Sequence, residues 1–364
     1  MVIKKWLKRL FSMREKRLLS NYYKRKLTRS LKELPEHRKL SRTQKKEIQD
    51  FYKGMIGRKV SLYSHEYFYS RTGVYSKEYI PTNLYHVELH PKANVYSYRN
   101  AYADKNMIDT FLPDAKHPHT YLKNMNGYFY WENQPVTREE AIEKCYNLKD
   151  VLIKPSLEYS GHGVKKLDVT DGVTNIDGLT IDELFSKYKK NYQIQAILKQ
   201  HPRMNLLNPT SVNTIRVFTY RSGMEILVIY AVVRIGRMGE VIDNQCAGGI
   251  SAIIGEDGKL GTNGFSGYTS DTIKVTDSGT VLDGFEIPSF QKVLDLVKSQ
   301  HYRLPFFNFI GWDIAIDVEG DPVIIEWNAN TGLSQSAFGP GFGKYTERII
   351  RELWPRENSI NPLW

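Results

Sequence analysis

The sequence of 364 residues lacks the features that several protein classes need. Its only cysteines, Cys145 and Cys246, lie far apart and outside any CxxC or Cys/His set, so neither a disulfide framework nor a zinc site is indicated. No apolar run approaches the roughly twenty residues of a membrane-spanning helix. We find no Ser/His/Asp or Cys/His signature of a covalent catalyst, no internal repeat and no low-complexity tract. We therefore expect a soluble, globular protein of two or three packed units in a reducing cytoplasm.

Charge is abundant but unevenly distributed. The formal net charge is +11, whereas residues 1–46 alone hold 17 Lys or Arg and three Glu, a balance of +14. The basic surplus therefore belongs to an N-terminal arm, residues 1–46, and the remaining chain carries −3. Near the start of the arm, apolar residues recur at helical spacing with basic residues between them, which predicts a basic amphipathic helix. The apolar positions are Val2, Ile3, Trp6, Leu7, Leu10 and Phe11.

Two interpretations of this helix remain open. It could lie on an anionic membrane surface, with Trp6 and Phe11 at the headgroup boundary and the cations facing acidic lipid. It could equally dock its apolar stripe on the protein body. Nucleic-acid binding by this helix is the third and least favoured alternative, and no nucleic-acid partner is expected.

The next stretch predicts a further helix and a tyrosine-rich domain. Ser41 is suited to cap a helix that runs to about Ile56, with Gly57 as its C-terminal stop. Residues 47–120 are expected to form the N-terminal domain, and ten tyrosines lie between residues 51 and 102. Such a density suits stacking against sugars, but Tyr is also an ordinary core and interface residue.

The segment 121–198 predicts a small α+β unit. Two capping boxes, each a Thr followed three residues later by Glu, start helices at Thr137 and Thr180. Between them lies a short apolar strand that ends in Lys154 and is followed by a Ser/Gly-rich loop, residues 155–164. A lysine and such a loop can fold over phosphates, because glycine lets backbone N–H groups approach oxygen closely. The glycines could also simply make a turn.

The segment 309–333 predicts a β-hairpin. Residues 311–318 and 322–328 each alternate apolar with small or polar residues, and Glu319-Gly320 lies between them. If these two residues form the whole loop, paired residue numbers sum to a constant, and that register is fixed by the turn.

The predicted register gathers three polar side chains on one face of the hairpin. It places Asp313 directly opposite Glu326, and Asn328 follows on the same face because strand side chains repeat every second residue. Two opposed carboxylates repel unless a cation lies between them, and oxygen-only ligands suit Mg²⁺. The alternative is a solvated β-ribbon whose acidic face points at water.

Several motifs together resemble the sugar-transfer-associated ATP-grasp family. They are VNTIRVFTY, VVRIG, VIDN with the following GGI, GWDIAI and IIEWNANTGL, and the resemblance covers about residues 40–350. It implies an α+β ATP-grasp fold, in which two α+β units with antiparallel sheets clamp a nucleotide, here with the basic helical arm added. Residues 121–198 would form the small subdomain and residues 199–364 the C-terminal subdomain with the metal site.

The resemblance also implies roles for individual residues. ATP with two Mg²⁺ ions would be the cofactor, and the phosphates would be held by Lys105, Lys154, Ser160, Gly161 and Gly163. Adenine would be read by the Gln195 side chain and the backbones of Ala196 and Leu198. The metal ligands would be Asp313, Glu326 and Asn328. Lys154, Arg216 and Arg234 would be catalytic, and the substrate would meet Asn244, Gly248, Gly249, Asn330, Thr331 and Gly332.

One position departs from a related branch. Ribosomal-protein glutamate ligases place an arginine just before the paired glycines, whereas this chain has Ala247 there. The anchor of the acyl substrate is therefore open, and Arg234 or Arg237 could take over this role.

The implied reaction is carboxylate activation. ATP would phosphorylate a carboxylic acid, and an amine would attack the acyl phosphate to give an amide, ADP and phosphate. The family's setting in bacterial polysaccharide biosynthesis suggests a sugar or polysaccharide carboxylate, such as a hexuronate of a capsule or exopolysaccharide, and an amino acid or other amine. Alternatives are a peptide-type amino-acid ligase, a kinase, or a non-catalytic nucleotide-binding scaffold of a membrane glycan machine. The expected location is the cytoplasm, with possible contact to the inner face of the cell membrane.

Overall fold

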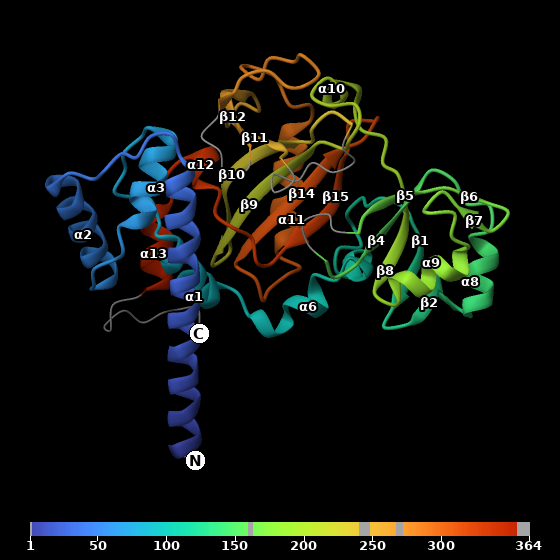
Figure 1. Cartoon of the computed structure of the whole chain (residues 1–364), viewed down its shortest axis with the longest axis horizontal. Helices are drawn as coiled ribbons and strands as arrows, with labels where there is room; N and C mark the ends of the chain where they lie inside the picture. The colour runs from blue at the N-terminus through green and yellow to red at the C-terminus, as the bar shows by residue number, and fades with distance from the viewer. Residues whose placement is uncertain (1, 159–162, 240–247, 267–271, 355–364) are drawn as a thin grey trace.

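A computed structural model describes residues 2–158, 163–239, 248–266 and 272–354, with side chains from Met13 onward (Figure 1). The N-terminal third is helical and is followed by two units, each built on an antiparallel sheet. The expected α+β architecture, with two units built on antiparallel sheets and an N-terminal helical arm, is confirmed. The boundaries predicted at residues 46, 120 and 198 stay a prediction.

The N-terminal third contains three longer helices and a series of short turns. α1 projects beyond the body at its N-terminal end (Figure 1). The predicted helix after the arm is confirmed, because Ser41 forms a capping box with Gln44 and Gly57 closes the C-terminus with φ of 71°. The elements are α1 (Val2–Glu33), α2 (Arg42–Ile56), α3 (Tyr63–Thr72), α4 (Thr82–Leu84), η1 (Tyr85–Leu89), α5 (His90–Ala93), η2 (Tyr96–Tyr98), α6 (Arg99–Tyr102), η3 (Lys105–Met107) and α7 (Ile108–Phe111).

Tertiary packing divides the basic arm into two parts. Leu27, Leu31 and Leu34 are buried against aromatic residues of the body that include Phe68, whereas Met13 is 58% exposed. The tyrosine-rich stretch is mostly structural, since several of its rings are buried in the core. The buried tyrosines are Tyr52, Tyr67, Tyr79 and Tyr85.

The smaller unit has a six-stranded antiparallel sheet in the order β3-β2-β1-β8-β4-β5. Both predicted capping boxes are confirmed, at Thr137 for α8 and Thr180 for α9. These helices pack on one face of the sheet, against a core that includes Leu122 and Ile194. The elements are β1 (Thr120–Met125), β2 (Tyr128–Trp131), β3 (Gln134–Val136), α8 (Arg138–Lys144), β4 (Val151–Pro155), β5 (Lys165–Leu167), β6 (Val169–Thr170), β7 (Val173–Thr174), α9 (Ile181–Tyr188) and β8 (Tyr192–Ala196).

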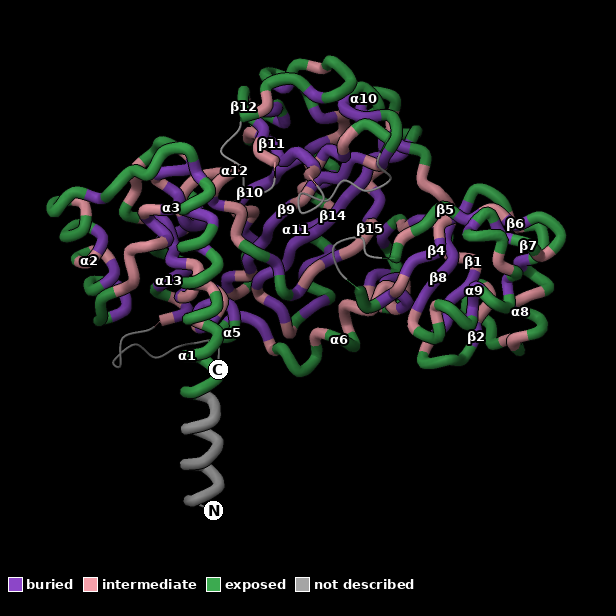
Figure 2. The backbone as a smooth tube through the Cα atoms, in the orientation of Figure 1, coloured by how far each residue is buried: buried purple, intermediate pink, exposed green. Residues whose placement is uncertain are grey.

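The larger unit has a seven-stranded antiparallel sheet in the order β13-β12-β11-β10-β9-β14-β15. Its central strands are largely buried (Figure 2). The elements are α10 (Pro202–Asn205), β9 (Thr214–Ser222), β10 (Glu225–Ile235), β11 (Ile250–Ile254), β12 (Leu260–Ser266), β13 (Thr272–Ile273), α11 (Phe290–His301), β14 (Phe309–Ile316), β15 (Pro322–Asn328), α12 (Gln335–Phe338), β16 (Gly341–Lys344) and α13 (Thr346–Leu353).

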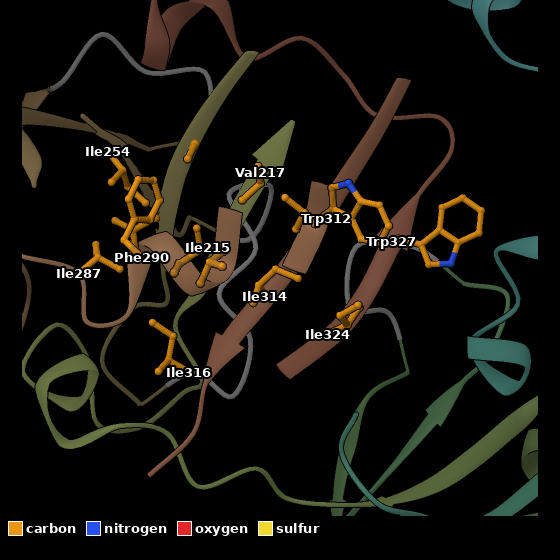
Figure 3. Close-up of a cluster of buried hydrophobic side chains, with 14 of the residues drawn as sticks. Ile215, Val217, Ile254, Ile287, Phe290, Trp312, Ile314, Ile316, Ile324 and Trp327 are labelled. Carbon is orange, nitrogen blue, oxygen red and sulfur yellow. The ribbon is translucent and has the colours of Figure 1, made fainter. Parts of the chain in front are cut away.

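The two faces of the larger sheet have different neighbours. One face packs against α11 through Ile215, Ile314 and Phe290, in the hydrophobic cluster drawn in Figure 3. The opposite face carries Phe218 and Phe309, which join a second cluster with the N-terminal helices and α13. Because side chains alternate along a strand, this opposite face also presents Arg216 on β9 and Asp313 on β14, where the polar site begins.

Candidate nucleotide and metal site

The β14–β15 hairpin has the predicted pairing but a different turn. Asp313 pairs with Glu326, as expected. The two-residue loop was wrong, because the Asp317 N–H donates to the Asp321 carbonyl at 3.0 Å, which makes a three-residue connection ending in Gly320 with φ of 82°. A β-bulge at Ile325 restores the register, since Ile314 pairs with Ile324 while Asp313 pairs with Glu326.

Asp313 is held by two arginines from neighbouring strands. Arg216 on β9 lies directly opposite and makes a bidentate pair, with Nε 2.6 Å from Oδ1 and Nη2 2.7 Å from Oδ2. Arg234 on β10 places Nη1 3.2 Å from Oδ1. Burial alone would raise the pKa of the Asp313 carboxyl, but the charges of Arg216 and Arg234 hold this pKa well below its usual range. Asp313 is therefore a buried, permanently charged carboxylate.

Glu326 and Asn328 complete the predicted set of oxygen ligands. The Asn328 Nδ2 atom lies 3.3 Å from Asp313 Oδ2 and 3.3 Å from Glu326 Oε1, so the three side chains meet on one face of the hairpin. Within the described ranges, no group of three His, Cys, Asp or Glu side chains could hold a metal, and this set has only two carboxylates.

The donor chemistry nevertheless fits Mg²⁺. Each carboxylate oxygen has two acceptor positions, so Asp313 can share an oxygen between Arg216 and an ion. Asn328 would present its amide oxygen by rotation of the amide, whose orientation follows its hydrogen-bond partners. Glu326 is more accessible than Asp313, with side chains that are 25% and 3% exposed.

The face of the hairpin that carries Asp313, Glu326 and Asn328 is called the metal face. The two lysines predicted to bind phosphate lie against it. The Lys105 Nζ is 3.2 Å from Glu326 Oε2 and donates to the Glu158 carbonyl at 2.8 Å. Lys154 is buried on β4, and burial together with the neighbouring Lys105 charge lowers its pKa from 10.5 to about 8. The structure therefore brings Lys105, Lys154 and Glu326 together from separate parts of the chain.

Besides Lys105 and Lys154, the structure shows a third lysine near the site, Lys123 on the smaller sheet, which the sequence analysis missed. Lys123 on β1 and Lys154 on β4 both pair with Gln193 on the strand between them, so the three lie in one row across the sheet. Lys123 is buried, and its Nζ lies 2.6 Å from Asp109 Oδ2. The available signal was a lysine inside the alternating strand that begins at Thr120, but strand order was needed to place it.

The predicted adenine residues lie where β8 ends. The Gln195 side chain donates to the Pro118 carbonyl at 3.2 Å, and the Ala196 N–H donates to the His119 carbonyl at 2.8 Å. These donors are used within the smaller unit, so base contacts would fall to the remaining groups of this stretch, including the backbone of Leu198. Their assigned role stays a prediction.

The glycine-rich loops are only partly described. Ser160, Gly161 and Asn244 lie outside the described residues, as does Ala247. Gly163 has φ of 75°, which favours glycine for conformational reasons alone.

The remaining glycine and arginine candidates lie near β11. Gly248 and Gly249 precede this strand, and Gly248 has φ of 92°. Arg237 pairs with Asp277 at 2.8 Å, so it is engaged by a carboxylate other than Asp313.

The predicted substrate residues after β15 differ in exposure. Thr331 is buried, and its Oγ1 accepts a hydrogen bond from Arg216 Nη1 at 3.3 Å. Its carbonyl also accepts from the Tyr85 hydroxyl, which gives Thr331 a structural role. Asn330 and Gly332 are exposed, and these two are better placed to meet a substrate.

A search of solved structures finds matches at low sequence identity. The L-amino acid ligase from Bacillus licheniformis is 11% identical with a TM-score of 0.37, covering 64% of this chain and 41% of that chain. The ATP-grasp ligase PsnB complexed with a minimal precursor is 15% identical with a TM-score of 0.37, covering 69% and 60%. The biotin carboxylase domain of the Hydrogenobacter thermophilus 2-oxoglutarate carboxylase is 11% identical with a TM-score of 0.40, covering 70% and 46%.

The chain thus spans about two fifths to three fifths of the length of these structures. No curated protein matches the sequence. The family model for sugar-transfer associated ATP-grasp proteins matches residues 85–349, which is most of the chain and includes both sheets and every predicted ligand of the metal face. The chain belongs to the sugar-transfer associated ATP-grasp family.

Proposed function

We propose that this protein is an ATP-dependent carboxylate–amine ligase that joins an amino acid to a hexuronic acid of a capsule or exopolysaccharide. The observation that carries the proposal is the meeting of Lys105 and Lys154 with Glu326 at the junction of the two sheets. Cations that can hold phosphate there face carboxylates that can hold Mg²⁺, which is the arrangement that phosphoryl transfer requires.

The residues would act by charge and position. Lys105 and Lys154 bind the transferring phosphoryl group, while Glu326 and Asn328, with Asp313, would hold Mg²⁺. The bound ion supplies further neutralisation of the phosphate oxygens. Arg216 is fixed by Asp313 and can orient a substrate anion.

The proposed reaction needs no nucleophile from the protein. A carboxylate oxygen takes the γ-phosphoryl group of ATP, and ADP leaves. The amine nitrogen then forms a bond to the acyl carbon, the bond from that carbon to the phosphate oxygen breaks, and the nitrogen loses a proton.

The direct test is product analysis with a mixed pool of uronic acids and amino acids. We expect ADP and phosphate, and not AMP, to accumulate only when an acid and an amine are both present. ADP without need of an amine would point to a kinase, and turnover of peptides but not uronic acids would point to a peptide-type ligase. Magnesium-dependent ATP binding without turnover on any pool would favour a scaffold.

Lys154 predicts a pH dependence of ATP binding. Its pKa of about 8 means that the ammonium is charged at pH 7 and largely neutral at pH 9. Because only the charged form attracts phosphate, ATP affinity should fall by about tenfold between pH 7 and pH 9. Calorimetric titration measures this, and Lys154→Ala should bind ATP more weakly with a flatter profile. A wild-type affinity that stays constant across this range would remove the assigned role.

We also propose that the distal part of the arm contacts an anionic membrane surface from the cytoplasmic side. Within the described residues, no helix combines the length and apolarity needed to cross a bilayer. Met13 and Leu18 on α1 are 58% and 61% exposed, so the body does not cover them. This exposure, with the basic surplus of the arm, supports interfacial binding.

Liposome co-sedimentation tests the membrane proposal. A variant lacking residues 2–13 keeps the buried Leu27 and Leu31, whereas removal of residues 1–46 would take away part of the core. We expect the full chain to pellet with anionic vesicles and the shortened chain to stay in solution. Equal pelleting of the two proteins would contradict the proposal.

A further inference from the structure

A cavity of about 360 Å³ lies between the N-terminal helices and the segment that follows the metal-binding hairpin. One wall is formed by α1 with Tyr22, Tyr23 and Lys26, and another by α3 with Arg71. A further wall is residues 332–337, which follow the candidate substrate residues Asn330 and Thr331. The cavity therefore joins the arm to the substrate end of the ligase site.

The lining of this pocket combines flat rings with positive charge. Tyr23 is stacked on His86, with ring centroids 4.4 Å apart and planes 6° from parallel, and the ring of Tyr22 is 56% exposed. Among the described residues that line the pocket, Lys26 and Arg71 are the cations and none is an acid. Burial, and then the Lys26 charge, lowers the pKa of His86 to about 4, so this imidazole is neutral at pH 7. The positive charge of the described lining therefore comes from Lys26 and Arg71.

Hydrogen bonds also connect the pocket to the Arg216–Asp313 ion pair. Gly332 is part of its wall, and the Gly332 carbonyl accepts from the Tyr230 hydroxyl at 3.4 Å. The preceding residue, Thr331, accepts from Arg216, which in turn pairs with Asp313. A molecule in the pocket would therefore contact Gly332. The residue before it in sequence, Thr331, contacts the catalytic Arg216 through its side chain.

We propose that this pocket binds an anionic sugar unit of the substrate, next to the unit whose carboxylate is activated. The proposal rests on the proposed ligase function and names part of its substrate. Aromatic faces suit the apolar face of a sugar ring, Ser334 and Ser336 offer hydroxyl partners, and the cations suit a carboxylate or phosphate. The N-terminal arm then contributes directly to substrate binding.

The test is saturation-transfer NMR and calorimetry on the full-length protein with glucuronic acid, glucose 1-phosphate and glucose. We expect the two acidic sugars to bind more tightly than glucose, and Lys26→Gln to weaken the acidic sugars by about three- to fivefold without changing glucose. Lys24→Gln is the matched control, because it removes the same charge from the same exposed helix at a position that does not line this pocket. Tyr22→Ala should weaken all three sugars.

Each outcome separates this proposal from the ligase function. Equal weakening by Lys26→Gln and Lys24→Gln, or equal binding of glucose and glucuronic acid, would overturn the pocket assignment. Absence of sugar binding while ATP with magnesium still binds and is turned over would also overturn it and leave the ligase function standing. Failure of ATP binding or of ADP formation would instead count against the ligase function. Preference for glucose 1-phosphate over glucuronic acid would identify phosphate as the anion.

Discussion

Glu326→Gln is expected to reduce ADP formation by at least about a hundredfold while the free energy of unfolding changes by less than about 1 kcal/mol. The substitution keeps the size of the side chain but removes the charge that would hold Mg²⁺. Its structural cost is small, because Glu326 is partly exposed and loses only its contact with Lys105. Removing one of two opposed carboxylates also relieves their repulsion. ADP release and urea unfolding measure the two effects separately.

The same hairpin offers a matched control. Glu319 lies in the turn, and its side chain is 64% exposed, so Glu319→Gln removes an equal charge away from the metal face. This variant should keep wild-type activity. Full activity in Glu326→Gln would refute the metal assignment, whatever the control shows.

Asp313→Asn should behave differently, because Asp313 also stabilises the fold. The substitution leaves Arg216 and Arg234 without their shared counter-charge in a buried site, where removal of one partner costs about 3–5 kcal/mol. Asparagine keeps some hydrogen bonds, so we expect a loss near the lower end, about 3 kcal/mol, together with loss of activity. Urea unfolding of both variants measures the contrast with Glu326→Gln.

The pH dependence of this stability difference has a definite sign. The folded-state pKa of Asp313 is depressed, so its contribution is present above the unfolded-state pKa of about 3.9 and is lost as pH falls toward the folded-state value. The difference between wild type and Asp313→Asn should therefore be constant from pH 8 to about pH 5 and shrink below about pH 4. Equal stability of the two proteins at pH 7 would show that the arginines do not depend on Asp313.

Local signals in the sequence were sufficient where the structure is decided by neighbours along the chain. The capping boxes at Thr137 and Thr180 and the helix from Ser41 follow from short-range hydrogen bonds. The pairing of Asp313 with Glu326 was correct although the turn was not, because the three-residue turn and the bulge at Ile325 offset each other.

Features that depend on strand order could not be predicted in the same way. The pairing of Arg216 with Asp313 needs β9 beside β14, and these strands are distant in sequence. Lys123 joins Lys154 only because β8 lies between their strands. The sequence likewise does not indicate that Leu27, Leu31 and Leu34 of the arm are buried, since that depends on the aromatic surface they meet.

The charged side chains at the junction of the sheets have a consequence for the order in which ATP, Mg²⁺ and the acidic substrate would bind. Among the described residues, these side chains comprise five cations and three carboxylates, so the junction neutralises most of its own charge and keeps an excess of two positive charges. A nucleoside triphosphate that carries one magnesium ion is a dianion and would cancel this excess. A second Mg²⁺ ion would then add positive charge that nothing compensates, unless the carboxylate substrate bound with it. The acidic substrate and the second Mg²⁺ should therefore favour each other's binding. The charged groups are Lys105, Lys123, Lys154, Arg216, Arg234, Asp109, Asp313 and Glu326.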